Sequence, residues 1–125
     1  MGLVRARIEI ANAKDPDHKT LTVTSLVDSG AALLCLPESV ASRLELEEVD
    51  RRPVRTADGT RHEVPYVGPV LIRFENRSCL AGALVMGDEV LLGAVPMEEM
   101  DVLISPRTQT LVVNPANPDG PVFRV

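Results

Sequence analysis

Aromatic residues are scarce in this sequence, which holds Tyr66, Phe74 and Phe123 but no tryptophan. Proteins that bind single-stranded nucleic acid stack bases on aromatic side chains. Proteins that bind a phosphate backbone carry an excess of Lys and Arg, whereas the formal net charge here is −5. We therefore expect no nucleic-acid partner.

Cysteine and histidine are also few, with two of each: Cys35, Cys79, His18 and His62. Their spacing contains neither C-x-x-C nor H-x-x-x-H, so the sequence predicts no zinc site. We expect no metal and no other cofactor. Both cysteines lie in apolar runs, which favours buried and reduced thiols that act as small hydrophobic residues.

Long apolar runs are missing as well. The first ten residues, MGLVRARIEI, alternate charged and apolar side chains, and they lack the apolar core of a signal peptide. No stretch approaches the length of a membrane-spanning helix. We therefore expect a cytoplasmic protein with no membrane partner.

What the sequence does contain is a series of short apolar segments. Between residues 4 and 10 apolar and charged residues alternate, which predicts a half-buried strand. The turn that follows contains Asp15, Asp17 and His18, which we interpret as a solvated turn rather than a metal cluster. Further strands are predicted near residues 21–27, 32–36, 70–74, 80–86, 89–93, 101–105 and 110–114. A clear helix is predicted at 37–46 and a short one at 95–100. Pro53, Pro65 and Pro69 suggest edge or projecting strands between them.

These elements predict one mainly β domain. The chain has 125 residues, of which 45% are hydrophobic, enough for a modest core. We count roughly eight short strands, which favours a closed barrel or a sandwich. The domain is expected to cover residues 1–114, and residues 115–125 form a tail rich in Pro and Gly.

The segment LVDSGAALLCLP places the ionisable Asp28 at the end of an apolar run. Asp28 could simply cap a turn, or its burial could serve chemistry. An unpaired buried charge is costly, and neither Lys nor Arg lies within a few residues. A second copy of Asp28 is one possible partner, because two carboxyl groups in contact share a single proton. Such a pair provides one acid and one base, which can activate a water molecule.

Four segments occur in an order that carries a resemblance: VDSGA (27–31), PESVASRL (37–44), TADG (56–59) and LLG (91–93). Together they resemble the retropepsin-type, single-lobed aspartic proteases. The stretch from Leu91 to Val113 also resembles the end of cellular and bacterial members. The resemblance covers residues 1–114, and it implies a closed β-barrel with a flap hairpin.

The resemblance implies a role for each matching residue. Asp28 would be the catalytic acid, one from each subunit. Ser29 would hydrogen-bond across the twofold axis, Gly30 would offer backbone groups to the substrate, and Ala31 keeps the neighbourhood small. A flap tip that would close over a peptide is formed by Ala57, Asp58, Gly59 and Thr60. The active-site loop would be supported from below by Leu91, Leu92 and Gly93.

One D-S-G triplet per chain makes the expected enzyme a homodimer, with the axis between the two Asp28 residues. The expected activity is hydrolysis of peptide bonds in a peptide or protein substrate. By resemblance, the N-terminal strand and residues 111–113 would add to the interface. A catalytically silent peptide-binding or dimerisation module is the main alternative. A monomeric β domain in which Asp28 only caps a turn is another.

Some residues depart from the family pattern or allow two interpretations. Ala32 and Ala94 stand where viral members often have an acidic residue and an arginine, Ser105 replaces a frequent Asp, and the flap tip has no aromatic residue. Asp58 is expected to form a turn and His62 to be an exposed strand residue. Glu98, Glu99 and Asp101 are expected to form a solvated helix end, and Cys35 to be structural rather than a pocket or redox residue.

Overall fold

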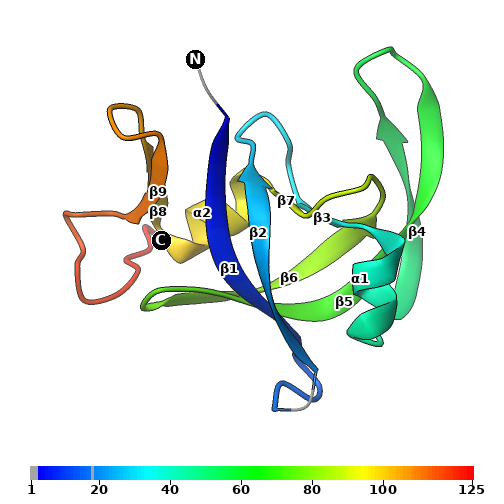
Figure 1. The fold of residues 1–125 in the computed structure, drawn as a ribbon, viewed down its shortest axis with the longest axis horizontal. Helices are drawn as coiled ribbons and strands as arrows, with labels where there is room; N and C mark the ends of the chain where they lie inside the picture. The colour runs from blue at the N-terminus through cyan, green and yellow to red at the C-terminus, as the bar shows by residue number, and fades with distance from the viewer. Residues whose placement is uncertain (1–2, 18) are drawn as a thin grey trace.

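A computed structural model describes residues 3–17 and 19–125. His18 of the predicted turn lies outside the described residues. The remainder folds into nine strands and two short helices (Figure 1). In chain order these elements are β1 (Val4–Asn12), β2 (Thr20–Val27), β3 (Leu34–Leu36), α1 (Glu38–Arg43), β4 (Glu47–Arg55), β5 (Arg61–Phe74), β6 (Arg77–Val85), β7 (Leu91–Leu92), α2 (Ala94–Met100), β8 (Val102–Ser105) and β9 (Thr110–Val113).

Strand β1 follows from its alternation of side chains. Ala6, Ile8 and Ile10 are buried, while Arg5 and Arg7 point to solvent. β1 pairs with β2 as an antiparallel hairpin, in register from Val4 opposite Val27 to Ala11 opposite Thr20. The hairpin carries residue 28 to the end of a paired strand.

Six strands close into a barrel. The large sheet has the order β1-β2-β7-β3-β6-β5-β4, and β1 also pairs with β5. This extra pairing joins the two ends of the sheet and leaves β4 outside the ring. The predicted closed, mainly β fold is confirmed. A separate hairpin of β8 and β9 lies on the opposite side of the molecule from β4 (Figure 1).

Strands β4 and β5 continue beyond the barrel as a long hairpin, shown in green in Figure 1. Pro53 lies in the outer strand β4, as expected for proline. For Pro69 the edge-strand prediction is wrong, because this part of β5 lies between neighbouring strands. The pairing of β5 with β6 shifts register between Val67 and Val70, and this irregularity accommodates the proline.

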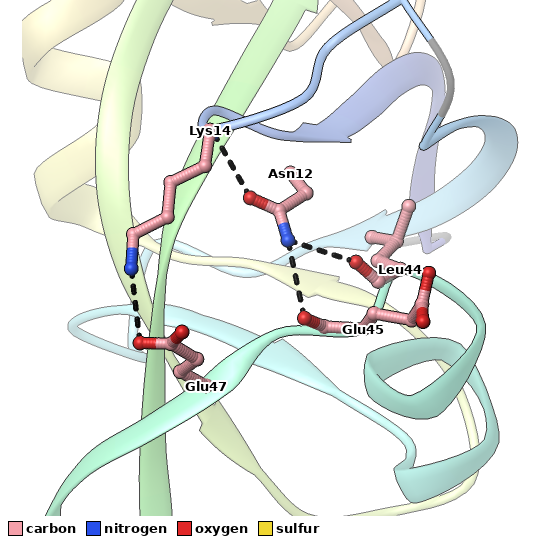
Figure 2. A network of polar contacts seen from close by, with 5 residues as sticks. All are labelled: Asn12, Lys14, Leu44, Glu45 and Glu47. Carbon is pink, nitrogen blue, oxygen red and sulfur yellow. Dashed lines mark hydrogen bonds and ion pairs between the residues drawn. The ribbon is translucent and has the colours of Figure 1, made fainter.

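Helix α1 is held at its end by a side chain from β1 (Figure 2). Asn12 is nearly buried, and its Nδ2 donates to the carbonyl oxygens of Leu44 and Glu45 at 3.0 and 3.1 Å. Its Oδ1 accepts from the amide of Lys14 at 3.0 Å. The helix is shorter than predicted, because the chain turns into a left-handed conformation at Glu45 (φ 52°).

The tail is bound to the body rather than free. Asp101, at the end of α2, accepts hydrogen bonds from the side chains of Asn114 (3.0 Å) and Asn117 (2.7 Å) and from the amide of Val122 (3.3 Å). The Asn114 and Asn117 hydrogen bonds lower the pKa of Asp101. The buried Arg77 donates to the Asn117 carbonyl at 2.6 Å. Glu98 and Glu99 are exposed, as predicted for a solvated helix end, whereas Asp101 is half-buried and is also bonded to the tail.

Candidate active site

Asp28 lies at the point where β2 leaves the barrel. Its amide donates to the carbonyl of Leu92 at 3.0 Å, which continues the parallel pairing of β2 with β7. The side chain is half-buried. Oδ1 accepts the amide of Gly30 at 2.9 Å, and the Asp28 carbonyl accepts the amide of Ala31 at 3.1 Å. Asp28 therefore does close a turn, as one interpretation predicted.

The second carboxylate oxygen of Asp28 is not used by that turn. No hydrogen bond to Oδ2 and no ion pair to Asp28 is found in the part of the chain that the structure describes. One oxygen fixes the orientation of the carboxyl group, and the other can accept a proton or a water molecule. A carboxyl group with one oxygen fixed and the other free to exchange a proton is suited to acid–base chemistry.

The loop after Asp28 rests on Gly93. A methyl group at Gly93 would lie 2.4 Å from the carbonyl oxygen of Leu33 and 2.8 Å from that of Ala31, so no larger residue fits. The amides of Ala94 and Val95 donate to the carbonyl groups of Ala31 and Ala32 at 2.8 and 2.9 Å. Two backbone hydrogen bonds thus hold the loop at Ala31 and Ala32 against the start of α2.

A cleft of about 700 Å³ opens beside Asp28. Its floor is apolar, and its other wall is the outer strand β4. Leu33, Leu84, Met86 and Leu91 belong to the floor, and residues 52–57 form the wall. Successive side chains of an extended peptide point in opposite directions. Every second side chain of a peptide in this cleft could therefore contact the apolar floor.

Cys35 lies in this cleft and is only half-buried, contrary to the prediction of a purely structural thiol. Burial raises the pKa of the Cys35 thiol, and the nearby charge of Asp28 adds to the effect. Cys35 is therefore a neutral thiol at pH 7 and a poor nucleophile. Cys79 is buried as predicted, and burial raises its pKa to about 12.

The tip of the projecting hairpin is a tight turn. Gly59 has φ 85°, and its amide donates to the Thr56 carbonyl at 2.9 Å. Asp58 Oδ1 accepts the Thr56 hydroxyl at 2.6 Å and the Thr60 amide at 2.9 Å, and these bonds lower the pKa of Asp58 to about 2. Asp58 is thus a turn residue, as predicted. Of the predicted flap tip, Ala57 alone lines the cleft.

A second hollow of about 490 Å³ also reaches Asp28. It is lined by apolar residues of β1, β2 and the β8–β9 hairpin: Leu3, Val4, Leu26, Val27, Ile104 and Pro106. The N-terminal strand was predicted near this surface, but Ile104 and Pro106 were missed, because nothing local in the sequence links them to Asp28. Of residues 111–113, which were also predicted near the interface, Leu111 is buried in the core of its own chain, while Val112 and Val113 are half-buried.

Comparisons with solved structures agree with the fold. The EIAV protease complexed with the inhibitor HBY-793 matches with a TM-score of 0.53 and 20% sequence identity, over 78% of this chain and 86% of that one. The solution structure of the simian foamy virus (mac) protease matches with a TM-score of 0.46 and 20% identity, over 74% and 91%. No protein-family model and no curated protein matches the sequence. The chain therefore has a retropepsin-like fold, as the sequence resemblance predicted.

The described residues contain neither a metal-binding cluster nor a membrane-spanning helix. Among residues 3–17 and 19–125, no three His, Cys, Asp or Glu side chains lie close enough together to hold a metal ion. Within the same residues, neither helix has the length and apolarity needed to cross a membrane.

Proposed function

We propose that two copies of this chain form a homodimeric aspartic endopeptidase. The observation that carries the proposal is the position of Asp28, which lines both the main cleft and the second hollow. The main cleft would bind the peptide, and the second hollow would contact the partner copy. Each chain supplies half of the catalytic pair.

In the proposed reaction the two Asp28 carboxyl groups share one proton. The ionised carboxylate removes a proton from a water molecule, whose oxygen attacks the carbonyl carbon of the scissile bond. The protonated carboxyl donates its proton to the carbonyl oxygen. As the carbon–nitrogen bond breaks, the carboxyl protonated by water passes its proton to the leaving amine. The other carboxylate takes a proton from a hydroxyl group of the tetrahedral intermediate, so the products are a carboxylic acid and an amine, and the pair again shares one proton.

The other residues would position the peptide and the acids. Gly93 and Leu92 would hold the loop that carries Asp28, and Ser29, which is exposed, would meet its copy across the axis. The flap tip at Ala57 to Thr60 would close over the peptide. The peptide would lie as an extended strand with alternate side chains in separate pockets.

Replacement of Asp28 by Asn gives a sharp test. Asparagine keeps an Oδ1 that can accept the Gly30 amide, so the turn should survive. We expect wild-type protein to cleave a mixed library of fluorogenic peptides, with inhibition by an aspartic-protease inhibitor. D28N should show no cleavage but the same oligomeric state by size-exclusion chromatography. Cleavage retained in D28N would end the proposal.

A silent peptide-binding module is the second candidate. The turn between Asp28 and Gly30 and the missing charge pair at Ala32 and Ala94 favour it. This candidate predicts peptide binding by the wild-type protein with no inhibitor-sensitive cleavage at any protein concentration. Monomeric behaviour at every concentration, with no peptide binding, would instead favour the simple β domain.

A further inference from the structure

The outer part of the projecting hairpin, residues 51–62, is basic although the whole chain is acidic. The chain carries a net charge of −5, yet the segment RRPVRTADGTRH (51–62) has four arginines and a single acidic residue. This basic segment forms the wall and tip above the main cleft. Its charge therefore faces any peptide that enters.

Two of the four arginines already have partners. Arg51 pairs with Glu48 at 3.3 Å. Arg52 pairs with Asp50 at 3.0 Å, and its guanidinium also stacks over the ring of Tyr66, 4.2 Å from the centroid.

Arg55 and Arg61 lack such partners. Neither forms an ion pair within residues 3–17 and 19–125. The closest polar contact of Arg55 is the Gly59 carbonyl oxygen, 3.5 Å from Nη1. Asp58 is the only acidic residue of the segment, and its Oδ1 is bonded to Thr56 and Thr60. Glu63 follows two residues after Arg61 on β5, but in the described part of the chain it forms no ion pair with either arginine.

The strand register makes this arrangement unfavourable on its own. Arg55 lies directly opposite Arg61 in the antiparallel pairing of β4 and β5, so both side chains leave the same face. Like charges in directly opposed positions destabilise a sheet. Arg55 and Arg61 also line a small hollow, together with Pro53 and Val54. Of these four residues, Pro53, Val54 and Arg55 line the main cleft as well.

We propose that Arg55 and Arg61 form a carboxylate-binding subsite that selects peptides with an Asp or Glu side chain beneath the flap. The proposal rests on the proposed peptide-binding function. Guanidinium groups bind carboxylates through paired, charge-assisted hydrogen bonds. A bound carboxylate would also relieve the repulsion between the two arginines. The apolar floor at Leu84, Met86 and Leu91 would take the apolar side chains of the same peptide.

The test measures binding separately from cleavage. D28N protein is incubated with a mixed library of extended peptides at fixed ionic strength, because exposed charges are screened by salt. Enriched sequences are then resynthesised as matched Glu and Gln peptides, and their affinities are measured by fluorescence anisotropy. The same measurements are made on D28N carrying R55Q and R61Q together, and on D28N carrying R43Q. Arg43 is an exposed residue of α1 outside the cleft, so its replacement removes one charge without touching the subsite.

We expect D28N to bind the Glu peptide about tenfold more tightly than the Gln peptide, a difference typical of one charge-assisted contact. The R55Q and R61Q pair should reduce this ratio to about twofold or less, and R43Q should leave it unchanged. An absent Glu preference, a preference that survives in the double variant, or no peptide binding would overturn the subsite. Tighter binding of an oligouridylate than of the Glu peptide would also overturn it.

The same experiment distinguishes the two proposals. Glu-selective binding by D28N, with no cleavage by the wild-type chain, would support the subsite and reject the peptidase. Cleavage by the wild-type chain without any preference for Glu over Gln would support the peptidase and reject the subsite.

Discussion

Gly93 lies directly against the carbonyl oxygen of Leu33, so that a methyl group at Gly93 would come within 2.4 Å of it. The neighbouring atoms are backbone atoms of the loop that carries Asp28, and they can yield only if that loop moves. Stability and the geometry of the site therefore depend on the same close contact.

We expect Gly93→Ala to lower the free energy of unfolding by about 1–3 kcal/mol, the usual cost of forcing extra volume into a packed site. Chemical denaturation measures this loss, and peptide cleavage should fall with it because the Asp28 loop is displaced. Gly120→Ala is the matched control, since nothing lies within 4 Å of a methyl group there. Equal stability of the two variants would contradict the packing argument.

The turn at the tip of the β4–β5 hairpin should respond to acid through Asp58. Its pKa is lowered to about 2 by bonds from Thr56 and Thr60, whereas an unfolded aspartate has a pKa of about 3.9. The turn is therefore stabilised fully above the unfolded value, and this contribution is lost as the pH falls from about 4 towards 2. An NMR titration of the Asp58 carboxyl carbon should give a value near 2.

Thr56→Val provides the matched variant for that titration. The Thr56 hydroxyl is the largest cause of the shift, so its removal should raise the pKa of Asp58 towards the ordinary value. If Asp58 titrates near pH 4 in both the wild-type and the Thr56→Val protein, the Thr56 hydroxyl does not lower the pKa of Asp58.

Replacement of Asn12 should lower the free energy of unfolding more than replacement of an exposed asparagine. Asn12→Ala removes the donors to the carbonyl groups of Leu44 and Glu45, in a nearly buried position (Figure 2). We expect a loss of about 1–3 kcal/mol, the usual cost of unsatisfied buried polar groups. Asn76 is exposed and makes one hydrogen bond, to the Pro118 carbonyl. Thermal and chemical unfolding should show a loss of about 0.5 kcal/mol or less for Asn76→Ala, and similar losses at both sites would argue against the role of Asn12.

Local patterns predicted much of the fold. The alternation in residues 4–10 predicts β1, because one face of that strand lies against the core. The Asp58-Gly59 pair predicts the turn at the tip of the β4–β5 hairpin, since Gly59 adopts the positive φ that glycine tolerates. The resemblance placed Leu92 and Gly93 beneath the active-site loop; in the structure Leu92 accepts the Asp28 amide, and Gly93 lies against Ala31 and Leu33.

Features that depend on distant partners were not predicted. Pro69 lies in a central strand because a register shift between β5 and β6 accommodates it, and no local pattern signals that shift. Asp101 is held by Asn117 and Val122 of the tail, which lie far along the chain. Cys35 faces the cleft, whereas Leu34 and Leu36 are buried. The sequence did not predict this, because β3 has only three residues, too few for an alternating pattern to assign its faces.

The most direct test of the central claim is the activity of mixed dimers. Wild-type and D28N chains are unfolded together, refolded at several ratios and assayed at constant total concentration. If each site needs one Asp28 from each of two chains, activity should fall as the square of the wild-type fraction. Activity proportional to the wild-type fraction itself would mean that each chain acts alone, and it would contradict the shared site.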